Sequence, residues 1–430
     1  MDKITFEQLQ EELFHEKMSN GLSVYILPKK GFNKTYATFT TKYGSIDNTF
    51  IPLGKNEYTN VPDGIAHFLE HKLFEKEDGD VFQQFSRQGA SANAFTSFTR
   101  TAYLFSSTSD VEKNLETLID FVQEPYFSEK TVEKEKGIIG QEITMYDDNA
   151  DWRLYYGLIQ NMYQNHPVKI DIAGTIESIS HITKDLLYEC YNTFYHPSNM
   201  LLFIVGPVDP EAIMNQVRDN QAKKEYEAMP EIQRKFAEEP QPVAEKKQIL
   251  KMNVQTSKCL VGVKALHVNQ NGKEMLKNEL AINVLLDMLF SKSSENYQQL
   301  YNKELIDDTF SYDYSQENGF GFAMLGGDTD QPDQLALELE KMLLAAKAGE
   351  AFTEEQLERT KKKKIGAFLR AVNSPEYIAN QFTRYAFNDM DLFDVVPTLE
   401  QITLADVKSL ASDFINEERF SVCQVVPKNN

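Results

Sequence analysis

The stretch Gly64-Ile-Ala-His-Phe-Leu-Glu-His-Lys-Leu-Phe74 places His67, Glu70 and His71 in the order H-x-x-E-H. If this stretch is helical, the two histidines lie one turn apart on one face and Glu70 lies beside them. The apolar residues fall on the opposite face, so the helix can be anchored in a core while the polar groups face a cleft. Asp63 is the expected N-cap. The sequence therefore predicts a metal-binding helix that carries its own general base.

A catalytic zinc takes three protein ligands and keeps one position open, so the two histidines need a third ligand from another segment. Residues 131–148 are a candidate helix, which carries Glu135 and Glu142 seven residues apart on nearly the same face. The two isoleucines between them are expected to contact the core. We take Glu142 as the third ligand. Zn²⁺ in such a site keeps one net positive charge and lowers the pKa of a bound water, whose proton Glu70 is placed to accept.

Chance and a purely structural role are the alternatives to a metal site. With seven histidines in 430 residues, about 0.01 accidental H-x-x-E-H matches are expected. A helical histidine pair four residues apart can also be a solvated face or two satisfied interior groups. The sequence that follows the motif argues against both alternatives.

The chain resembles the pitrilysin and insulinase superfamily of inverted-motif zinc peptidases, which includes the mitochondrial processing peptidase. The stretch from His67 to His71 matches the zinc helix of that family, residues 89–105 resemble its substrate-binding edge strand, and residues 135–153 resemble its third-ligand helix. Residues 374–385 are similar to a stretch of short bacterial members, which are half-length chains that work in pairs. The likeness covers nearly the whole chain.

The resemblance also implies roles for single residues. Glu142 is implied as a ligand of one Zn²⁺ per chain, with Glu135 as a supporting acidic residue near the metal. Asn93, Ala94 and Phe95 are implied to lie against the scissile segment of a peptide substrate. Read without the resemblance, this region is rich in Thr, Phe, Ser and Tyr, which favours an extended strand. An exposed edge strand can pair with the substrate backbone, whereas one more internal strand is the alternative.

The chain divides into two halves around residues 222–247, which are rich in Lys, Glu, Gln, Ala and Pro and are typical of a linker. Residues 1–221 form the predicted zinc-binding half, and residues 248–430 form the half without a metal site. A strand pair, helices, long strands, more helices and a closing strand recur in both. The expected fold is α+β, with two similar halves that each form a mostly antiparallel sheet with helices packed on one face, as the resemblance implies.

A register comparison of the two halves sharpens this repeat. The helix expected over residues 278–290 superposes on the metal helix so that Asn283, Leu286 and Asp287 take the positions of His67, Glu70 and His71. The apolar positions survive while the metal-site residues are lost, as expected when a duplicated half keeps its packing role and loses the chemistry. Only the N-terminal half is predicted to bind zinc.

Composition bounds the class of protein. A chain of 430 residues that is 41% hydrophobic can fold into two or three globular domains. Its net charge of −21 argues against a nucleic-acid partner, and no run approaches the roughly 18 apolar residues of a membrane span. Cys190, Cys259 and Cys423 form no cluster, so we assign them to packing in a cytoplasmic protein. The short basic run from Lys361 to Lys364 is expected to be an exposed helix face.

One part of the family pattern is missing. Members with a full active site usually carry, in the C-terminal half, an Arg and a Tyr that hold the substrate carbonyl, but the corresponding residues 291–314 contain no Arg. An oxyanion donor is often worth about 3 kcal/mol in the barrier. We therefore expect a homodimer or heterodimer in which a related chain supplies this carbonyl clamp and the pair encloses a cavity.

The expected function is a zinc metalloendopeptidase that hydrolyses small or unfolded peptides in that cavity, with metal-activated water and Glu70 as general base. The alternative is a non-catalytic scaffold or peptide-binding subunit of a processing-peptidase-like complex. The intact set of His67, Glu70, His71 and Glu142 favours the enzyme, because a scaffold has no physical need to keep four converging polar groups.

Overall fold

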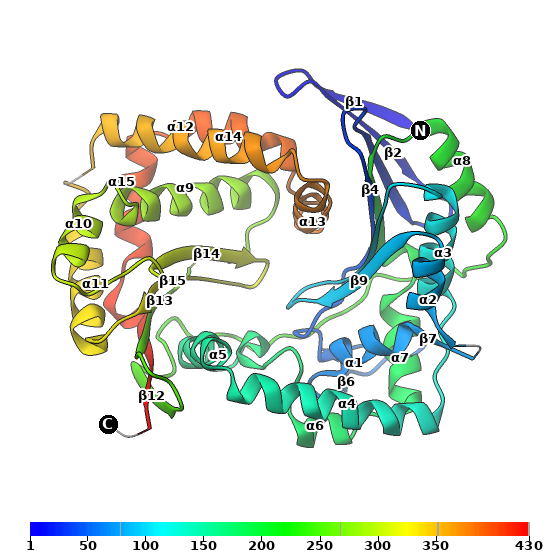
Figure 1. Ribbon diagram of the computed structural model, residues 1–430, viewed down its shortest axis with the longest axis horizontal. Coiled ribbons are helices and arrows are strands. Elements are labelled where there is room, and N and C mark those ends of the chain that lie inside the picture. Colours follow the sequence, from blue (N-terminus) through cyan, green and yellow to red (C-terminus); the bar gives the residue numbers. More distant parts are fainter. Residues whose placement is uncertain (78, 267, 351, 429–430) are drawn as a thin grey trace. The chain divides into compact units, whose positions relative to one another are not determined.

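The computed structural model describes residues 1–77, 79–266, 268–350 and 352–428. The chain forms two compact units, and each unit is assembled from three segments of the sequence. Each unit is built around one large β-sheet with helices packed on it, so the predicted α+β class is confirmed (Figure 1). Unit 1 comprises Met1–Ile143, Asp171–Phe236 and Ala371–Phe387, and unit 2 comprises Thr144–Ile170, Ala237–Arg370 and Asn388–Asn430.

The described strands of unit 1 form a seven-stranded sheet in the order β1-β2-β3-β11-β4-β10-β9. β3 and β11 are parallel, and the other neighbouring strands are antiparallel. The strands of the unit are β1 (Asp2–Phe6), β2 (Glu11–Lys17), β3 (Ser23–Pro28), β4 (Thr35–Thr41), β9 (Ala90–Thr96), β10 (Thr101–Ser107), β11 (Met200–Gly206) and the short pairs β5 (Thr49–Phe50) with β6 (Thr59–Asn60) and β7 (Glu75–Lys76) with β8 (Gly79–Asp80). Its helices are α1 (Ile65–Leu73), α2 (Val81–Arg87), α3 (Val111–Gln123), α4 (Glu129–Asp148, which ends in unit 2), α6 (Ile176–Ser180), α7 (Lys184–Phe194), α8 (Pro210–Gln221) and α13 (Pro375–Ala386), with a 3₁₀ turn at Pro197–Asn199.

The described part of unit 2 repeats this topology in the order β12-β16-β13-β15-β14, again with one parallel pair, β12 with β16. The order matches β3-β11-β4-β10-β9 of unit 1, which confirms the predicted repeat. Its strands are β12 (Lys247–Met252), β13 (Lys258–Lys264), β14 (Ser311–Glu317), β15 (Phe320–Asp328) and β16 (Phe420–Pro427). Its helices are α5 (Ala150–Met162), α9 (Gly272–Phe290), α10 (Glu295–Asn302), α11 (Pro332–Ala346), α12 (Glu354–Ala371), α14 (Val395–Gln401) and α15 (Leu404–Phe414), with 3₁₀ turns at Pro167–Lys169, Leu392–Asp394 and Glu417–Arg419.

Two helices are exchanged between the repeats, so the units differ there from the continuous ranges expected from the sequence. α5 follows the first repeat's α4 in the chain but packs on β13 and β16 of unit 2, and α13 follows the second repeat's α12 but packs on β4 and β11 of unit 1. α5 approaches β13 so closely at Gly262 that a Cβ atom there would lie 2.8 Å from Sδ of Met162. A helix contributed by the other repeat therefore completes the core of each unit.

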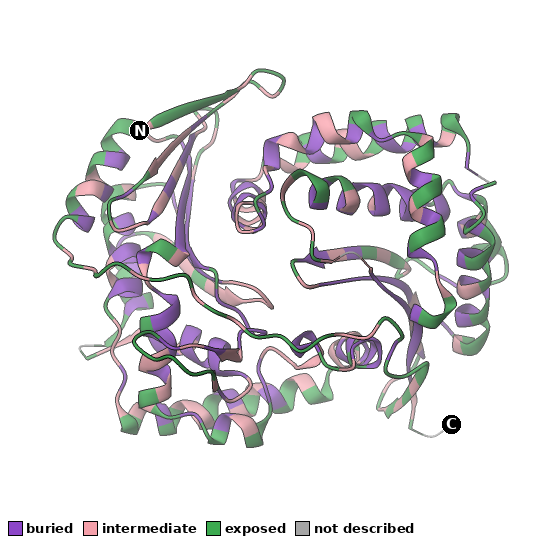
Figure 2. Cartoon of the chain, turned by 180° about the vertical axis from the view of Figure 1, so that it is seen from behind, coloured by how far each residue is buried: buried purple, intermediate pink, exposed green. Residues whose placement is uncertain are grey.

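The exchanged helix α13 explains why the central strands of unit 1 are buried on both faces. Every residue of β4 and β11 is buried, and Figure 2 shows these strands in purple. Phe203 of β11 packs on Phe382 of α13, with ring centroids 4.7 Å apart. On the opposite face, Tyr103 of β10 packs on Phe121 of α3 at 5.7 Å. Continuous apolar runs are the expected pattern for strands that are covered on both sides.

The prediction of an exposed basic face at Lys361 to Lys364 is wrong in part. Lys361 is 8% exposed, and its Nζ atom donates to the backbone oxygens of Glu400 at 2.9 Å and Ile402 at 3.2 Å, next to the end of α14. A cation at that position is favourable because helix ends leave carbonyl groups without partners. Burial lowers the pKa of Lys364. Within this run, Lys361 holds α12 against the end of α14, while other residues of the run face solvent.

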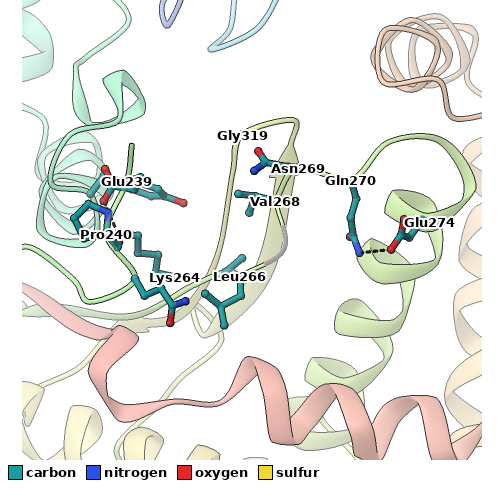
Figure 3. A pocket seen from close by; sticks show the side chains of 12 residues that line it. Glu239, Pro240, Lys264, Leu266, Val268, Asn269, Gln270, Glu274 and Gly319 are labelled. Atoms are coloured by element: carbon teal, nitrogen blue, oxygen red, sulfur yellow. Dashed lines mark hydrogen bonds and ion pairs between the residues drawn. The ribbon is translucent and has the colours of Figure 1, made fainter. Parts of the chain in front are cut away.

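The segment between the repeats is held at two points. In unit 1, the Nε atom of Arg234 donates to Asp47 at 2.7 Å, and Arg234 forms an isolated β-bridge with Phe50. In unit 2, the carboxylate of Glu239 pairs with the ammonium of Lys264. Glu239 and Lys264 are labelled at one side of a pocket of about 470 Å³, and Gln270 and Glu274 at the other (Figure 3). Only a few residues therefore separate the two attachment points.

Glu239 is the main anchor in unit 2. Its oxygens accept the backbone N–H groups of Gln164 at 2.9 Å and of Asn165 and His166 at 2.7 Å, directly after α5. Burial alone would raise the pKa of Glu239, but Lys264 and these N–H groups outweigh burial and hold the pKa below its ordinary value of 4.5. The stabilisation is therefore complete above pH 4.5 and is lost as the pH falls through the lower pKa of the folded state.

Glu239→Ala is expected to destabilise unit 2 by about 3 kcal/mol. The substitution leaves three N–H groups and the buried Lys264 ammonium without their carboxylate, although Lys264 keeps the backbone oxygen of Pro240 at 2.6 Å. Trp152, the single tryptophan, lies in α5, so urea unfolding followed by its fluorescence reports on unit 2. Glu238→Ala at the exposed neighbouring position is the control. Equal unfolding midpoints for the two variants would contradict this role.

Candidate metal centre

The helix α1 begins differently from the expectation. Gly64, not Asp63, is the N-cap, with a φ of 88° and no side-chain cap. A Cβ atom at Gly64 would lie 2.4 Å from the backbone oxygen of Ala173, so both the left-handed conformation and the close approach require glycine. The side chain of Asp63 instead accepts a hydrogen bond from Asn48 at 3.3 Å. The predicted apolar face is confirmed, since the residues on it are all buried: Ile65, Phe68, Leu69 and Leu73.

The polar face of α1 and the helix α4 bring three potential ligands together within unit 1. One nitrogen each of His67 and His71 and one oxygen of Glu142 all lie within 4.8 Å of one another. Nε2 of His67 is 3.7 Å from Oε1 of Glu142, and Nε2 of His71 is 3.6 Å from Oε2. No other such group of three is found in the described ranges. The structure thus brings together the three residues that the sequence predicts as ligands.

These distances fit a metal better than direct hydrogen bonding. A separation of 3.6–3.7 Å is longer than a hydrogen bond. Each distance, one to Oε1 and the other to Oε2 of Glu142, is close to the roughly 3.4 Å that separates two ligand atoms in a tetrahedral site with bonds of about 2.0–2.1 Å. Two imidazoles and a carboxylate are also a donor set that zinc accepts. The residues present therefore fit one zinc ion.

Protonation of the two histidines differs. The pKa of His67 is lowered to about 4, mainly by burial and then by the charge of His71. The ring of His67 is therefore neutral at pH 7, as a metal ligand must be. Burial alone would lower the pKa of His71, but the hydrogen bond with Glu135 and the charges of Glu70 and Glu142 outweigh burial and raise it. Metal binding at His71 is therefore expected to release a proton when this ring is charged.

Glu135 supports the site from behind His71. Its Oε1 atom lies 3.1 Å from Nδ1 of His71, which leaves Nε2 of the same ring facing Glu142. A carboxylate on the far nitrogen fixes the tautomer and the ring orientation of a histidine ligand. The supporting place near the metal that the resemblance implies for Glu135 agrees with this geometry.

Glu135→Gln is expected to weaken zinc binding about 10- to 100-fold. The amide can still contact His71 but no longer carries the negative charge that stabilises the metal-bound ring. Competition with a fluorescent zinc chelator measures the affinity. Glu133→Gln is the matched control, because Glu133 lies two residues before Glu135 on α4, points to a different side of the helix, is 69% exposed and pairs with Lys136. Unchanged affinity in the Glu135 variant would remove Glu135 from the site.

Glu70 lies beside the histidines on α1 and is 8% exposed. Its Oε2 atom accepts the hydroxyl of Thr96 on β9 at 2.6 Å. Burial raises the pKa of Glu70, against the hydrogen bond from Thr96 and the charge of His71, which lower it. Glu70 therefore has the burial and the proximity to the ligand set that a general base needs.

The helix α4 places Glu135 and Glu142 as the seven-residue spacing predicts, but one of the two isoleucines between them is misassigned. Ile139 is fully buried, whereas Ile138 is 45% exposed. The buried residues of α4 are Val132, Ile139 and Ile143, so the core-facing stripe passes through Ile139. Ile138 lies about 100° away from that stripe.

The strand expected to bind substrate is at the edge of the sheet. β9 carries Asn93, Ala94 and Phe95 and pairs with β10 on one side, while no described strand pairs with its other side. Asn93 is exposed, and Ala94 and Phe95 are partly exposed. The edge position excludes the alternative of an internal strand. Contact of these three residues with a substrate stays a prediction.

The matching position of unit 2 has lost the metal chemistry. Leu286 is buried, and Asn283 donates to the backbone oxygen of Glu279 of its own helix at 3.0 Å. Asp287 is 3% exposed and accepts the hydroxyl of Tyr312 at 2.5 Å and the ammonium of Lys363 at 2.7 Å. A buried carboxylate paired with a lysine stands where unit 1 has His71. The pairing with Tyr312 and Lys363 was not anticipated, because both come from other elements.

Two family models match the chain. The model described as "Insulinase (Peptidase family M16)" matches residues 50–176, which include the whole metal centre. The model described as "Peptidase M16 inactive domain" matches residues 181–364, which include the part of unit 2 where the ligands are lost. The candidate ligands thus all lie in the first match, while the second match begins in unit 1 and continues into unit 2.

Relatives with similar sequences cover the full length. The "Uncharacterized zinc protease YmfH" of Bacillus subtilis is 71% identical over 426 residues, which are 99% of each chain. The "Uncharacterized zinc protease YmxG" of the same organism is 27% identical over 89% of this chain and 92% of its own length. Among solved structures, a "putative M16-like peptidase from Alicyclobacillus acidocaldarius" has a TM-score of 0.93 at 39% identity, covering 97% of this chain and 98% of the other. "A protease from Helicobacter pylori" has a TM-score of 0.82 at 20% identity, covering 97% of this chain and all of the other, and this likeness concerns the fold alone.

A pair of repeated α+β units, one of which carries converging histidines and glutamates on two helices, defines the M16-like class of peptidase folds. Three observations assign the chain to its family: this site, the two family-model matches, and a relative that is 71% identical over nearly its whole length. The chain belongs to peptidase family M16, the pitrilysin and insulinase superfamily, and is of its half-length type. The predicted resemblance is confirmed. No helix in the described ranges is long and apolar enough to span a bilayer.

Proposed function

We propose that this chain is a zinc endopeptidase that hydrolyses small or unfolded peptides. The observation that carries the proposal is the convergence of His67, His71 and Glu142 within 4.8 Å, with Glu70 on the same helix turn. The names of the relatives YmfH and YmxG as zinc proteases support it. A bound zinc would supply a Lewis acid that polarises the peptide carbonyl and lowers the pKa of a water molecule.

The residues of the chain have separate roles in this proposal. His67, His71 and Glu142 hold the ion, and Glu135 keeps the ring of His71 in the tautomer that binds through Nε2. Glu70 accepts the proton of the attacking water and then passes it to the leaving amine. β9 presents an open edge to which an extended peptide can add as a strand, so substrate recognition rests on backbone hydrogen bonds.

A second chain is part of the proposal. The segment that should carry the carbonyl clamp, residues 291–314, has no Arg, and its Tyr312 is bound to Asp287. We propose that a related chain, in a homodimer or a heterodimer, supplies an Arg and a Tyr for this purpose in a cavity that the pair encloses. We also propose that the protein works in the cytoplasm, which suits its buried free cysteines Cys190, Cys259 and Cys423.

Metal analysis of the purified protein together with a peptide-cleavage assay tests the proposal. The expected result is close to one zinc per chain and cleavage of quenched fluorescent peptides that a chelator abolishes and zinc restores. Zinc well below one per chain would leave the alternative, a non-catalytic scaffold or peptide-binding subunit. Assaying the chain alone and with related chains from the same organism tests the need for a partner. Full activity of a monomer would contradict the proposed carbonyl clamp in trans.

A further inference from the structure

Thr96 is the one residue of the edge strand with a hydrogen bond to the candidate base. It is the last residue of β9, and its Oγ1 atom donates to Oε2 of Glu70 at 2.6 Å. This distance is in the range of strong hydrogen bonds from a hydroxyl to a carboxylate. The bond joins a residue of the sheet to a residue of α1 across 26 positions of sequence. It therefore links the strand proposed to dock substrate to the group proposed to move the proton.

The position of Thr96 is itself held by the hairpin. Thr101 of β10 lies directly opposite Thr96 in the β9–β10 register and is fully buried. The hydroxyl of Thr101 donates to the backbone oxygen of Tyr43 at 2.9 Å and lies 3.4 Å from the hydroxyl of Thr96. Because Thr101 is anchored on the neighbouring backbone, the β-branched side chain of Thr96 has a fixed surface on one side and Glu70 on the other.

A carboxylate that serves as general base must present one oxygen to the water it deprotonates. Glu70 has a side chain with three rotatable bonds and lies on a short helix, so an unheld carboxylate would sample several rotamers. The hydroxyl of Thr96 at Oε2, together with the backbone N–H group of the same residue, restricts that freedom and leaves Oε1 as the oxygen that the hydroxyl does not occupy. Precise placement of a reacting group can contribute several powers of ten in rate, and a small displacement can remove much of it.

We propose that Thr96 is a positioning residue that fixes Glu70 through its hydroxyl and so couples peptide docking on β9 to the geometry of the base. The inference rests on the proposed peptidase function. A peptide that adds to the open edge of β9 would restrain the strand at its Thr96 end, and the hydroxyl would transmit that restraint to Glu70. Because Thr96 acts through Glu70, its loss should lower kcat and leave zinc binding unchanged.

The test compares Thr96→Val, which keeps the shape and loses the hydroxyl, with Thr96→Ser, which keeps the hydroxyl. We expect kcat of Thr96→Val to fall about 10- to 100-fold, since a hydrogen bond to a charged group is lost, with KM changed less than about threefold. Thr96→Ser should recover kcat to within about threefold of the parent. Zinc content and melting temperature should match the parent in both. Thr108→Val, which removes an exposed hydroxyl just after β10, is the control.

A binding measurement separates failure of this inference from failure of the proposed function. A short peptide hydroxamate binds a catalytic zinc and shares its proton with the adjacent carboxylate, so its affinity for the zinc-loaded protein reports on Glu70 without turnover. We expect a loss of about tenfold in Thr96→Val and recovery in Thr96→Ser. If the zinc-loaded parent cleaves no peptide, the proposed peptidase function is wrong. The hydroxamate affinities of the parent and the two Thr96 variants still show whether Thr96 positions Glu70. Equal kcat or equal affinity in parent and Thr96→Val, or a loss that serine does not restore, would overturn the inference.

Discussion

Glu70→Gln is expected to bind about one zinc per chain and to hydrolyse peptides roughly 100- to 10,000-fold more slowly than the parent protein. Glutamine has the shape of glutamate and can still accept the hydroxyl of Thr96, but an amide cannot take up a proton from water. The side chain is 8% exposed, and burial raises the pKa of the carboxyl, so removing its charge also removes a desolvation penalty. The melting temperature should therefore stay level or rise slightly.

Initial cleavage rates of a quenched peptide and metal content by mass spectrometry check this result on the same preparation. Glu133→Gln on the exposed side of α4 is the control for loss of one negative charge. A Glu70→Gln protein that keeps more than about a tenth of the parent's activity would exclude Glu70 as the base. A variant that loses zinc would instead show that Glu70 contributes to the ligand set.

His71→Ala is expected to lose zinc binding under conditions in which the parent is saturated. Binding free energies of about 10–16 kcal/mol for structural zinc sites with four protein ligands correspond to roughly 2.5–4 kcal/mol per ligand, or about 70- to 1000-fold in affinity. The substitution also leaves Glu135 without the ring nitrogen that it contacts at 3.1 Å. Cleavage activity should disappear together with the metal.

The readout that does not depend on catalysis is thermal stability. A ligand that binds only the folded state raises the melting temperature, so added zinc should stabilise the metal-free parent and leave His71→Ala unchanged. His181→Ala removes an exposed histidine outside the metal centre and should behave as the parent does. A zinc-dependent rise in the melting temperature of His71→Ala equal to that of the parent would show that the metal binds elsewhere.

Much of the metal centre could be predicted because it depends on local geometry. Residues four apart on a helix must lie on one face, so His67 and His71 were expected to converge. The same rule placed Glu135 and Glu142 together on α4, and the choice of Glu142 as the third ligand agrees with the structure, which brings this carboxylate to the two histidines. The repeat could also be predicted, because the pattern of apolar residues in each half of the sequence indicates the order of its strands and helices.

The errors share one physical cause, which is contact between segments far apart in sequence. Asp63 has the side chain of a good N-cap, but the close approach of Ala173 demands a glycine at the helix start. Lys361 belongs to a charged run, but the carbonyl groups of Glu400 and Ile402 draw it into the interior. Ile138 is apolar, but α4 turns a different stripe toward the core.

The sequence by itself determined which helices carry the candidate ligands, the place of Glu70 beside the two histidines and the loss of these groups in the second repeat, because residue type and helical spacing are sufficient for each. Only the tertiary structure decided which residues serve these groups from outside: Thr96 on Glu70, Glu135 on His71 and Lys363 on Asp287. It also decided the exchange of α5 and α13 between the repeats. These pairings follow from the packing of whole sheets and helices, which brings together side chains that lie 26, 64 and 76 residues apart along the chain.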